Sequence, residues 1–302
     1  MNSYSSSEIL QQATVELQQA HIKEARFEAE LLLSHLLNVP KEYFVHQNMS
    51  IDNNIYTEFK ELIAKRKTRC PIQYLLGEWE FWSFQLLISE GVFIPRPETE
   101  TLVELALEHN LSHCKSLIDL GTGTGNISIA LAKEFPELLI FAVDISKQAL
   151  LNARNNIILN GLTKRIKLVQ SDFLTALNPG LFPAPVMIIS NPPYISPLEA
   201  TQLMDEIKLY EPVTSYLADN NGLECYFRII QQLDTWNLRP LYLMFEIAPH
   251  LADAIIEYAQ IHSFILMNSR YDLGGLQRAL LFERVGADPC VCLQRHGSIN
   301  LN

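Results

Sequence analysis

The sequence predicts an α/β protein with a doubly wound, seven-stranded sheet, preceded by a small all-helical domain and a linking β-hairpin. Short, nearly continuous apolar runs alternate with helical patterns from Glu98 onward, which is typical of strands covered on both faces. A stretch with helical periodicity alone comes before them. The length of 302 residues suits one large domain and one smaller one.

The first part of the chain has apolar positions at helical spacing, over 9–20 and again over 27–37. A further amphipathic segment, at about 52–67, ends in a basic cluster at 65–69. The cluster favours a solvated helix end over a docking patch for an acidic partner. We expect residues 1–72 to form a helical domain that docks the substrate.

The pattern changes between about 71 and 95, where aromatic and aliphatic residues alternate with polar ones and with Gly77 and Gly91. Such a pattern predicts a short hairpin. We therefore expect a hairpin linker over 73–95 and the α/β domain over 96–302, with a loosely packed tail over 285–302.

Strands and helices alternate in the α/β domain. The expected strands are 116–120, 139–143, 166–170, 186–190, 241–247, 263–268 and 278–284. The expected helices are 99–109, 126–134, 147–160 and 222–234.

Composition and charge exclude several classes of protein. Hydrophobic residues at 48% and charged residues at 19% fit a globular protein, and no apolar run has the length of a membrane helix. The N-terminal stretch lacks the basic and apolar segments of a secretion signal, so we expect a cytoplasmic location. We also expect a monomer. A net charge of −11 disfavours a large nucleic-acid footprint, although a local basic patch stays open.

The five cysteines are odd in number and scattered, which argues against a disulfide framework and favours reduced thiols. Cys290 and Cys292 have no second Cys or His pair at zinc spacing, so we expect no metal.

A glycine-rich turn, Gly121-Thr122-Gly123-Thr124-Gly125, follows the first strand of the α/β domain and leads directly into a helix. Glycines there allow positive φ and close approach of a ligand to the backbone. The dinucleotide fingerprint G-x-G-x-x-G needs a third glycine where this chain has Asn126. The turn therefore favours a ligand whose amino-acid tail lies over the loop, and disfavours a pyrophosphate.

Two further strand ends carry residues that suit a nucleoside. Asp144 ends the second strand, where a carboxylate accepts hydrogen bonds from ribose hydroxyls; the alternative is a helix cap. Asp172 and Phe173 follow the third strand and suit the amine and ring of adenine, although Phe173 is also interpretable as a core aromatic. Ribose and adenine without a phosphate cradle indicate S-adenosylmethionine.

The fourth strand ends in Asn191-Pro192-Pro193-Tyr194. Two prolines stiffen this turn and remove two backbone donors, so it presents carbonyl acceptors. The Asn191 side-chain carbonyl and the Pro192 backbone carbonyl are candidates to accept the hydrogens of a planar NH₂ group. They would return electron density to its nitrogen and stabilise the charge that develops during methyl transfer. We expect Tyr194 to stack on the planar group.

These residues resemble a known family. Asp119–Asn126 with Asn191–Tyr194 looks like the amino-methyltransferase branch of class I methyltransferases. More specific stretches are similar to the release factor glutamine methyltransferases, the HemK or PrmC family. They are Pro71–Phe81, Phe93–Glu100, Glu211–Pro212 and Asp219–Leu223.

The resemblance implies S-adenosylmethionine as methyl donor, S-adenosylhomocysteine as product, and the N5 amide of the glutamine in the Gly-Gly-Gln loop of peptide chain release factors as acceptor. By position it implies cofactor contacts from Gly121–Gly125, Asp144, Phe173 and Asn191, and substrate contacts from Asn191–Tyr194. Where the family usually carries Glu-Ile-Gly, this chain has Glu246-Ile247-Ala248-Pro249, which leaves the core motifs intact.

Three alternatives stay open at this stage. The same tetrapeptide also serves methylation of adenine or guanine amines in nucleic acid, but the acidic chain shows no target-recognition segment. A binding module that retains only the cofactor fold would leave the tetrapeptide without a role. Arg96, Glu98 and Glu100 either help to close the cofactor pocket or cap the helix that begins near Thr99.

Overall fold

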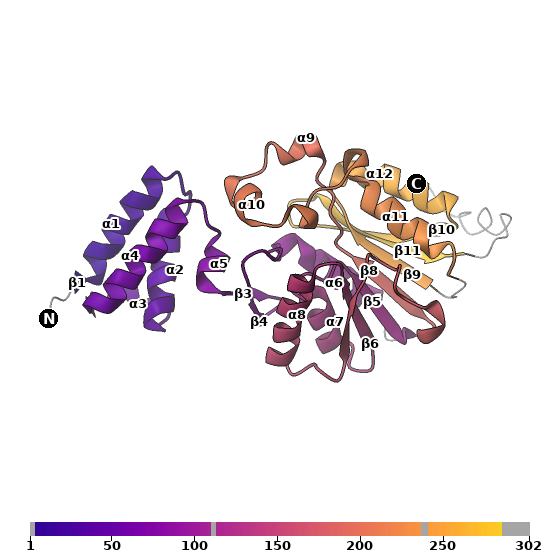
Figure 1. Ribbon diagram of the computed structural model, residues 1–302, viewed down its shortest axis with the longest axis horizontal. Coiled ribbons are helices and arrows are strands. Elements are labelled where there is room, and N and C mark those ends of the chain that lie inside the picture. The colour runs from indigo at the N-terminus through magenta and orange to yellow at the C-terminus, as the bar shows by residue number, and fades with distance from the viewer. Residues whose placement is uncertain (1–3, 110–112, 237–240, 286–302) are drawn as a thin grey trace, which may run out of the picture. The chain divides into compact units, whose positions relative to one another are not determined.

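The computed structural model describes residues 4–109, 113–236 and 241–285. The chain divides into two compact units (Figure 1). The first comprises Met1–Trp79, Leu87–Gly91 and Leu203–Glu211, and the second comprises Glu80–Leu86, Val92–Gln202 and Pro212–Asn302.

The first unit is mainly helical, as predicted. Leu17, Leu32, Leu33 and Phe59 are fully buried in its core because the apolar faces of the three longest helices meet there. A Ser5 cap and an Asp52 cap begin two of these helices. The helices are α1 (Ser6–Gln19), α2 (Ala25–Leu37), α3 (Tyr43–His46), α4 (Asn53–Lys67) and α5 (Ile72–Leu76), and β1 (Tyr4–Ser5) pairs with β2 (Ser50–Ile51).

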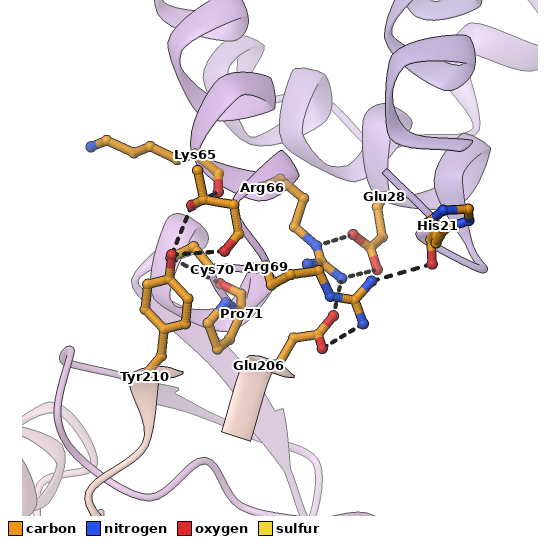
Figure 2. Close-up of polar contacts among 10 residues, drawn as sticks. His21, Glu28, Lys65, Arg66, Arg69, Cys70, Pro71, Glu206 and Tyr210 are labelled. Carbon is orange, nitrogen blue, oxygen red and sulfur yellow. Dashed lines mark hydrogen bonds and ion pairs between the residues drawn. The ribbon is translucent and has the colours of Figure 1, made fainter. Parts of the chain in front are cut away.

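A distant segment of the chain belongs to this helical unit. Helix α10 (Asp205–Tyr210) carries Glu206, which accepts hydrogen bonds from Arg66 at 3.1 Å and Arg69 at 2.6 Å (Figure 2). The Arg66 guanidinium also donates two hydrogen bonds to Glu28, and Arg69 donates to the backbone oxygen of His21. The interpretation of 65–69 as a solvated helix end is therefore wrong at Arg66, whose side chain is 6% exposed.

The second unit is built on a seven-stranded sheet of order β10-β11-β9-β8-β5-β6-β7. Strand β11 is antiparallel to both of its neighbours, and the pairs from β9 to β7 are parallel. This confirms the predicted fold class. The strands are β5 (Ser116–Leu120), β6 (Leu139–Asp144), β7 (Ile166–Gln170), β8 (Val186–Ser190), β9 (Leu241–Glu246), β10 (Phe264–Tyr271) and β11 (Gln277–Arg284).

The register of the parallel strands aligns their carboxyl ends. Leu120 of β5 lies opposite Val143 of β6 and Ser190 of β8, and Ser190 lies opposite Phe245 of β9. The segments that leave these strands start from one edge of the sheet, which is where open α/β sheets bind ligands.

Helices flank this sheet at the positions that the sequence predicts, and further helices were not predicted. Helix α12, which lies between two predicted strands, is not among the predicted helices. Helices α9 and α10 are too short to show a helical periodicity in the sequence. The longer helices are α6 (Glu100–Glu108), α7 (Asn126–Glu134), α8 (Lys147–Leu159), α11 (Glu224–Leu233) and α12 (Ala252–Ile261). The short turns are α9 (Pro197–Ala200), η1 (Pro97–Thr99), η3 (Pro179–Leu181), η4 (Val213–Ser215), η5 (Asn220–Gly222) and η6 (Pro249–Leu251).

The predicted hairpin is present but shorter than expected. It consists of β3 (Glu78–Phe81) and β4 (Phe84–Leu87), joined by Trp82 and Ser83, both with positive φ. Two consecutive residues with positive φ form a two-residue hairpin turn whose twist matches the twist of the paired strands. The residues before Glu78 form helix α5 instead, so the expected start of the hairpin at 73 is wrong.

Several expectations concern residues outside the described ranges. The predicted loose tail over 285–302 lies beyond them except for Val285, as do Cys290 and Cys292. Among the described residues, no helix has the length and apolar character needed to span a membrane.

The charge network around Glu206 predicts a local effect on α10. Glu206→Gln removes the charge that pairs with Arg66 and Arg69, so we expect local opening of α10 to become easier by roughly 1–3 kcal/mol. Hydrogen–deuterium exchange of the α10 amides measures this as about tenfold or faster exchange.

Asp205→Asn is the matched control, because Asp205 is the preceding residue of α10 and its exposed carboxylate pairs with Lys208. A surface pair of this kind contributes little. Equal exchange in the two variants would contradict a specific role for Glu206.

Candidate active site

The glycine-rich loop lies directly over the end of β5. The backbone N–H groups of Gly121 and Thr122 both donate to the Val143 carbonyl at 2.9 Å, and Gly125 N–H donates to Thr122 O at 2.8 Å. The three glycines have φ values of 74°, 55° and 82°, a region that residues with a Cβ avoid. A Cβ added to Gly123 would have no other atom within 4 Å, so the outer side of the loop is open to a ligand.

A buried carboxylate, Asp119, supports this loop from within the sheet. Its Oδ2 accepts hydrogen bonds from the hydroxyls of Thr122 and Ser128, both at 2.7 Å. Burial raises the pKa of Asp119 to about 6, against the lowering effect of the two hydroxyls. Asp119 is not among the predicted site residues, although an acid inside an apolar strand run is a signal of a buried role.

Asp144 lies at the end of β6 and faces the same loop. Its Oδ2 accepts from Gly123 N–H at 2.9 Å and its Oδ1 from Ser146 N–H at 2.8 Å. Burial raises the pKa of this carboxyl, and the backbone donors oppose the rise. The N-cap of α8 is Ser146, whose side chain accepts from Ala149 N–H, so Asp144 is not that cap. A carboxylate has about four acceptor sites, and the backbone N–H groups of Gly123, Ile145 and Ser146 are its donors here, so capacity for one further donor remains.

Phe173 follows β7, and the sequence left two roles open for it, a contact with adenine and a place in the core. Its ring is half-buried against the core of the second unit, with the Arg228 guanidinium 5.2 Å from the ring centroid. Asp172, expected to bind an adenine amine, forms an ion pair with Arg228. Phe173 is therefore partly a core aromatic, and an adenine contact from either residue stays a prediction.

The Asn191–Tyr194 turn, called the acceptor turn below, starts beside the glycine-rich loop. The Ser190 hydroxyl donates to Leu120 O at 2.7 Å and ties the ends of β8 and β5 together. As a result, the backbone oxygen of Asn191 lies 4.0 Å from the place where a Cβ on Gly121 would stand. The structure thus brings together the two motifs that the sequence analysis assigned to cofactor and acceptor.

The far side of this turn is held by a segment more than twenty residues further along the chain. Ile195 N–H donates to Tyr216 O at 2.8 Å, and Ala218 N–H donates to Ile195 O at 2.9 Å. Gly222 has a φ of 89°, and a Cβ there would overlap the backbone oxygen of Tyr194. The sequence analysis gave Gly222 only as part of a family resemblance. It supports the turn through close backbone approach.

Tyr194 itself is half-buried, and burial raises the pKa of its phenol. The phenol is therefore neutral at ordinary pH and its ring packs against the core of the second unit. A neutral, fixed aromatic ring suits stacking on a planar amide.

The acids around Thr99 have structural partners. Glu100 accepts a hydrogen bond from Trp82 N–H at 2.9 Å, and the backbone oxygen of Glu98 accepts one from the Thr101 hydroxyl at 2.6 Å. The Arg96 guanidinium lies 5.0 Å from the centroid of the Phe93 ring. Glu98 lies in the first turn of η1 and Glu100 in the first turn of α6, where a negative charge favours the start of a helix. Closure of the cofactor pocket by Arg96, Glu98 and Glu100 stays a prediction.

The packing at Gly222 predicts that its replacement disturbs the acceptor turn. In Gly222→Ala the new methyl group displaces the Tyr194 backbone, so we expect the rate of the methyl transfer that the sequence predicts to fall by roughly tenfold to a hundredfold. Gly161→Ala is the matched control, because Gly161 also has positive φ, 71°, but open space around it. Steady-state kinetics of both variants would show comparable rates if backbone strain alone mattered.

Comparisons with known proteins identify the family of the chain. The PrmC N-terminal domain matches residues 8–77, and the methyltransferase small domain matches residues 89–218. A release factor glutamine methyltransferase of Thermodesulfovibrio yellowstonii is 33% identical over 260 residues, which cover 85% of this chain and 92% of that protein. Another, of Koribacter versatilis, is 36% identical over 246 residues, covering 80% and 85%.

A solved structure shares the fold at low sequence identity. The hMettl16 catalytic domain, in complex with MAT2A 3′UTR hairpin 6, has a TM-score of 0.56 and 17% identity, and the match covers 84% of this chain and 93% of that one. This likeness concerns the fold alone. The two relatives are aligned over most of this chain and over most of their own length. This protein therefore belongs to the family of release factor glutamine methyltransferases.

Proposed function

We propose that the protein transfers a methyl group from S-adenosylmethionine to the N5 amide nitrogen of the glutamine in the Gly-Gly-Gln loop of peptide chain release factors. The observation that carries the proposal is the juxtaposition of Gly121 and Asn191, because it sets a turn of amide acceptors beside an open, glycine-lined ligand loop. The relatives named above act, by name, on release factor glutamine.

The residues at the sheet edge fit S-adenosylmethionine. The open side of the Gly121–Gly125 loop at Gly123 leaves room for the amino-acid tail of the ligand, and the Asp144 carboxylate keeps acceptor capacity for a ribose hydroxyl. Phe173 would lie against the adenine. When bound, the cofactor supplies a sulfonium-activated methyl group. The proposed reaction uses no metal ion.

The acceptor turn then has two tasks. The Asn191 side-chain oxygen and the Pro192 backbone oxygen accept the two hydrogens of the glutamine amide, which fixes the nitrogen and favours its charged form as the new bond develops. Pro192 and Pro193 have no N–H groups that would compete for the substrate carbonyl. Tyr194 stacks on the amide plane and sets the angle of approach.

The helical unit is proposed to dock the release factor away from the acceptor turn. It carries no recognisable catalytic motif, yet it is a well-packed unit whose core includes fully buried Leu17, Leu32 and Phe59. A protein substrate offers more surface than one glutamine side chain, and a separate docking surface raises affinity without altering the chemistry.

Methylation assays test the substrate first. Purified protein is incubated with methyl-labelled S-adenosylmethionine and either unmethylated release factor or unmethylated nucleic acid, and mass spectrometry locates the label. We expect label on the Gly-Gly-Gln glutamine, and a loss of roughly a hundredfold or more in Asn191→Ala because one acceptor is gone. Label on a base instead would replace the proposal by the nucleic-acid alternative, which the net charge of −11 disfavours.

The docking proposal predicts a difference between large and small substrates. Removal of residues 1–70 is expected to raise KM for full-length release factor by roughly tenfold or more and to leave KM for a short Gly-Gly-Gln peptide nearly unchanged. Circular dichroism of the shortened chain checks that the α/β unit is folded. An unchanged KM for the full-length substrate would refute docking by the helical unit.

A further inference from the structure

The side chain of Asn191 has a defined partner on its amide nitrogen. Nδ2 donates to the Thr99 hydroxyl at 3.2 Å. Thr99 ends the short helical turn η1 and is 1% exposed. An asparagine amide has nearly the same shape in its two orientations, so hydrogen bonding decides which end faces the substrate.

Thr99 in turn has a second partner, Glu246, with which its side chain is hydrogen-bonded. Glu246 is the last residue of β9 and is 2% exposed. Its position follows from the sheet register, because Ser190 lies opposite Phe245 and the next residues along the two strands are Asn191 and Glu246. The Glu246 Oε2 atom is buried without a hydrogen-bond partner among the residues that the structure describes, so the bond to Thr99 uses Oε1.

The chemistry of Glu246, Thr99 and Asn191 determines which group donates in each of the two hydrogen bonds between them. An ionised carboxylate only accepts hydrogen bonds, so the single hydrogen of the Thr99 hydroxyl points to Glu246. The hydroxyl oxygen is then left to accept, and the group that donates to it is the NH₂ of Asn191. The Asn191 Oδ1 atom consequently points away from Thr99.

We propose that Glu246 and Thr99 act as a positioning pair that orients the Asn191 amide so that its oxygen, and not its NH₂ group, faces the substrate nitrogen. This inference rests on the proposed function, since it explains how the acceptor turn presents an acceptor. Reversal of the Asn191 amide would direct two donors at an amide NH₂ group, which would neither hold it nor stabilise charge on its nitrogen.

The pair also makes the acceptor turn sensitive to pH. Several charged or titratable groups face Glu246: Arg278 from β11, Arg96 and Glu98 from the η1 region, Tyr194 from the acceptor turn and Tyr226 from α11. Burial is the largest influence and raises the pKa of Glu246 to about 7, while Thr99 and the two arginines oppose the rise.

Protonation of Glu246 removes the constraint that fixes this order of donors. A neutral carboxyl group can donate to the Thr99 oxygen, and the hydroxyl hydrogen is then free to bond Asn191 Oδ1 and let the NH₂ group face the substrate. The active form is therefore the ionised one. Activity is expected to fall as pH decreases through about 7, the value to which burial raises the pKa of Glu246.

Four variants of the full chain test this arrangement. Thr99→Val keeps the shape of the side chain and removes the hydroxyl, so we expect kcat to fall by roughly tenfold to a hundredfold, whereas Thr99→Ser recovers most of the activity. Glu246→Gln carries no ionisable group, so we expect a similar loss and disappearance of the acidic limb of the pH profile. Thr101→Val is the control, because the Thr101 hydroxyl donates to the Glu98 backbone oxygen; its kcat and pH profile should match those of the parent.

Two further readings separate positioning from general damage. Affinity for S-adenosylmethionine, measured by calorimetry, should stay within about twofold in every variant, because Asn191 borders the glycine-rich loop through its backbone oxygen, which reorientation of the side-chain amide leaves in place. Parental kcat in Thr99→Val, or a pH profile of Glu246→Gln with its acidic limb intact, would overturn the proposal. If Thr99→Val does not fold, the pH profile of Glu246→Gln alone gives the decision.

A readout that does not need the substrate distinguishes this inference from the proposed function. The side-chain ¹⁵N–¹H resonances of Asn191, assigned by their absence from Asn191→Asp, should titrate near pH 7 in the parent and not in Glu246→Gln. Titration without methylation of release factor would sink only the proposed function. Methylation with no such titration would sink only the positioning pair.

Discussion

The parallel register of β6, β5, β8 and β9 is the constraint on which the rest of the second unit depends. It sets the ends of four strands at one edge, so segments far apart in the chain become neighbours. A hydrogen bond of 2.7 Å from the Ser190 hydroxyl to Leu120 O links two of these ends directly. Without this alignment, the glycine-rich loop and the acceptor turn would be two unrelated motifs.

Buried polar groups then adjust the positions that the register sets. Asp119 receives two hydroxyl hydrogen bonds beneath the glycine-rich loop, and Glu246 bonds Thr99 behind the acceptor turn. Burial of a carboxylate is costly, and the raised pKa of both groups reflects that cost. The two acids therefore lie where orientation of the backbone or of an amide matters more than stability alone.

The helical unit uses charge in a different way. Arg66 is almost fully buried and is balanced by Glu28 and Glu206, the second of which comes from α10, a helix that begins eleven residues after Tyr194. The chain thus returns to the helical unit, over Leu203–Glu211, after the acceptor turn. Because charged partners must match in number and geometry, such a network specifies one position for α10 more strictly than apolar contact would.

The sequence by itself determined the fold class, the seven strands of the sheet, and the residues of the glycine-rich loop and acceptor turn. Apolar runs of strand length and glycine or proline turns are local signals, so they are readable without tertiary structure. The family resemblance, carried by local motifs, agreed with the curated relatives.

Only the tertiary structure decided which residues support those motifs. The roles of Gly222, Thr99 and Glu246 depend on contacts with Tyr194 and Asn191 across distant parts of the chain. The burial of Arg66 likewise depends on Glu206, since a basic cluster at a helix end has the same pattern whether water or a carboxylate faces it. Local sequence encodes the conformation of a turn, but what packs behind it is set by strand order and register.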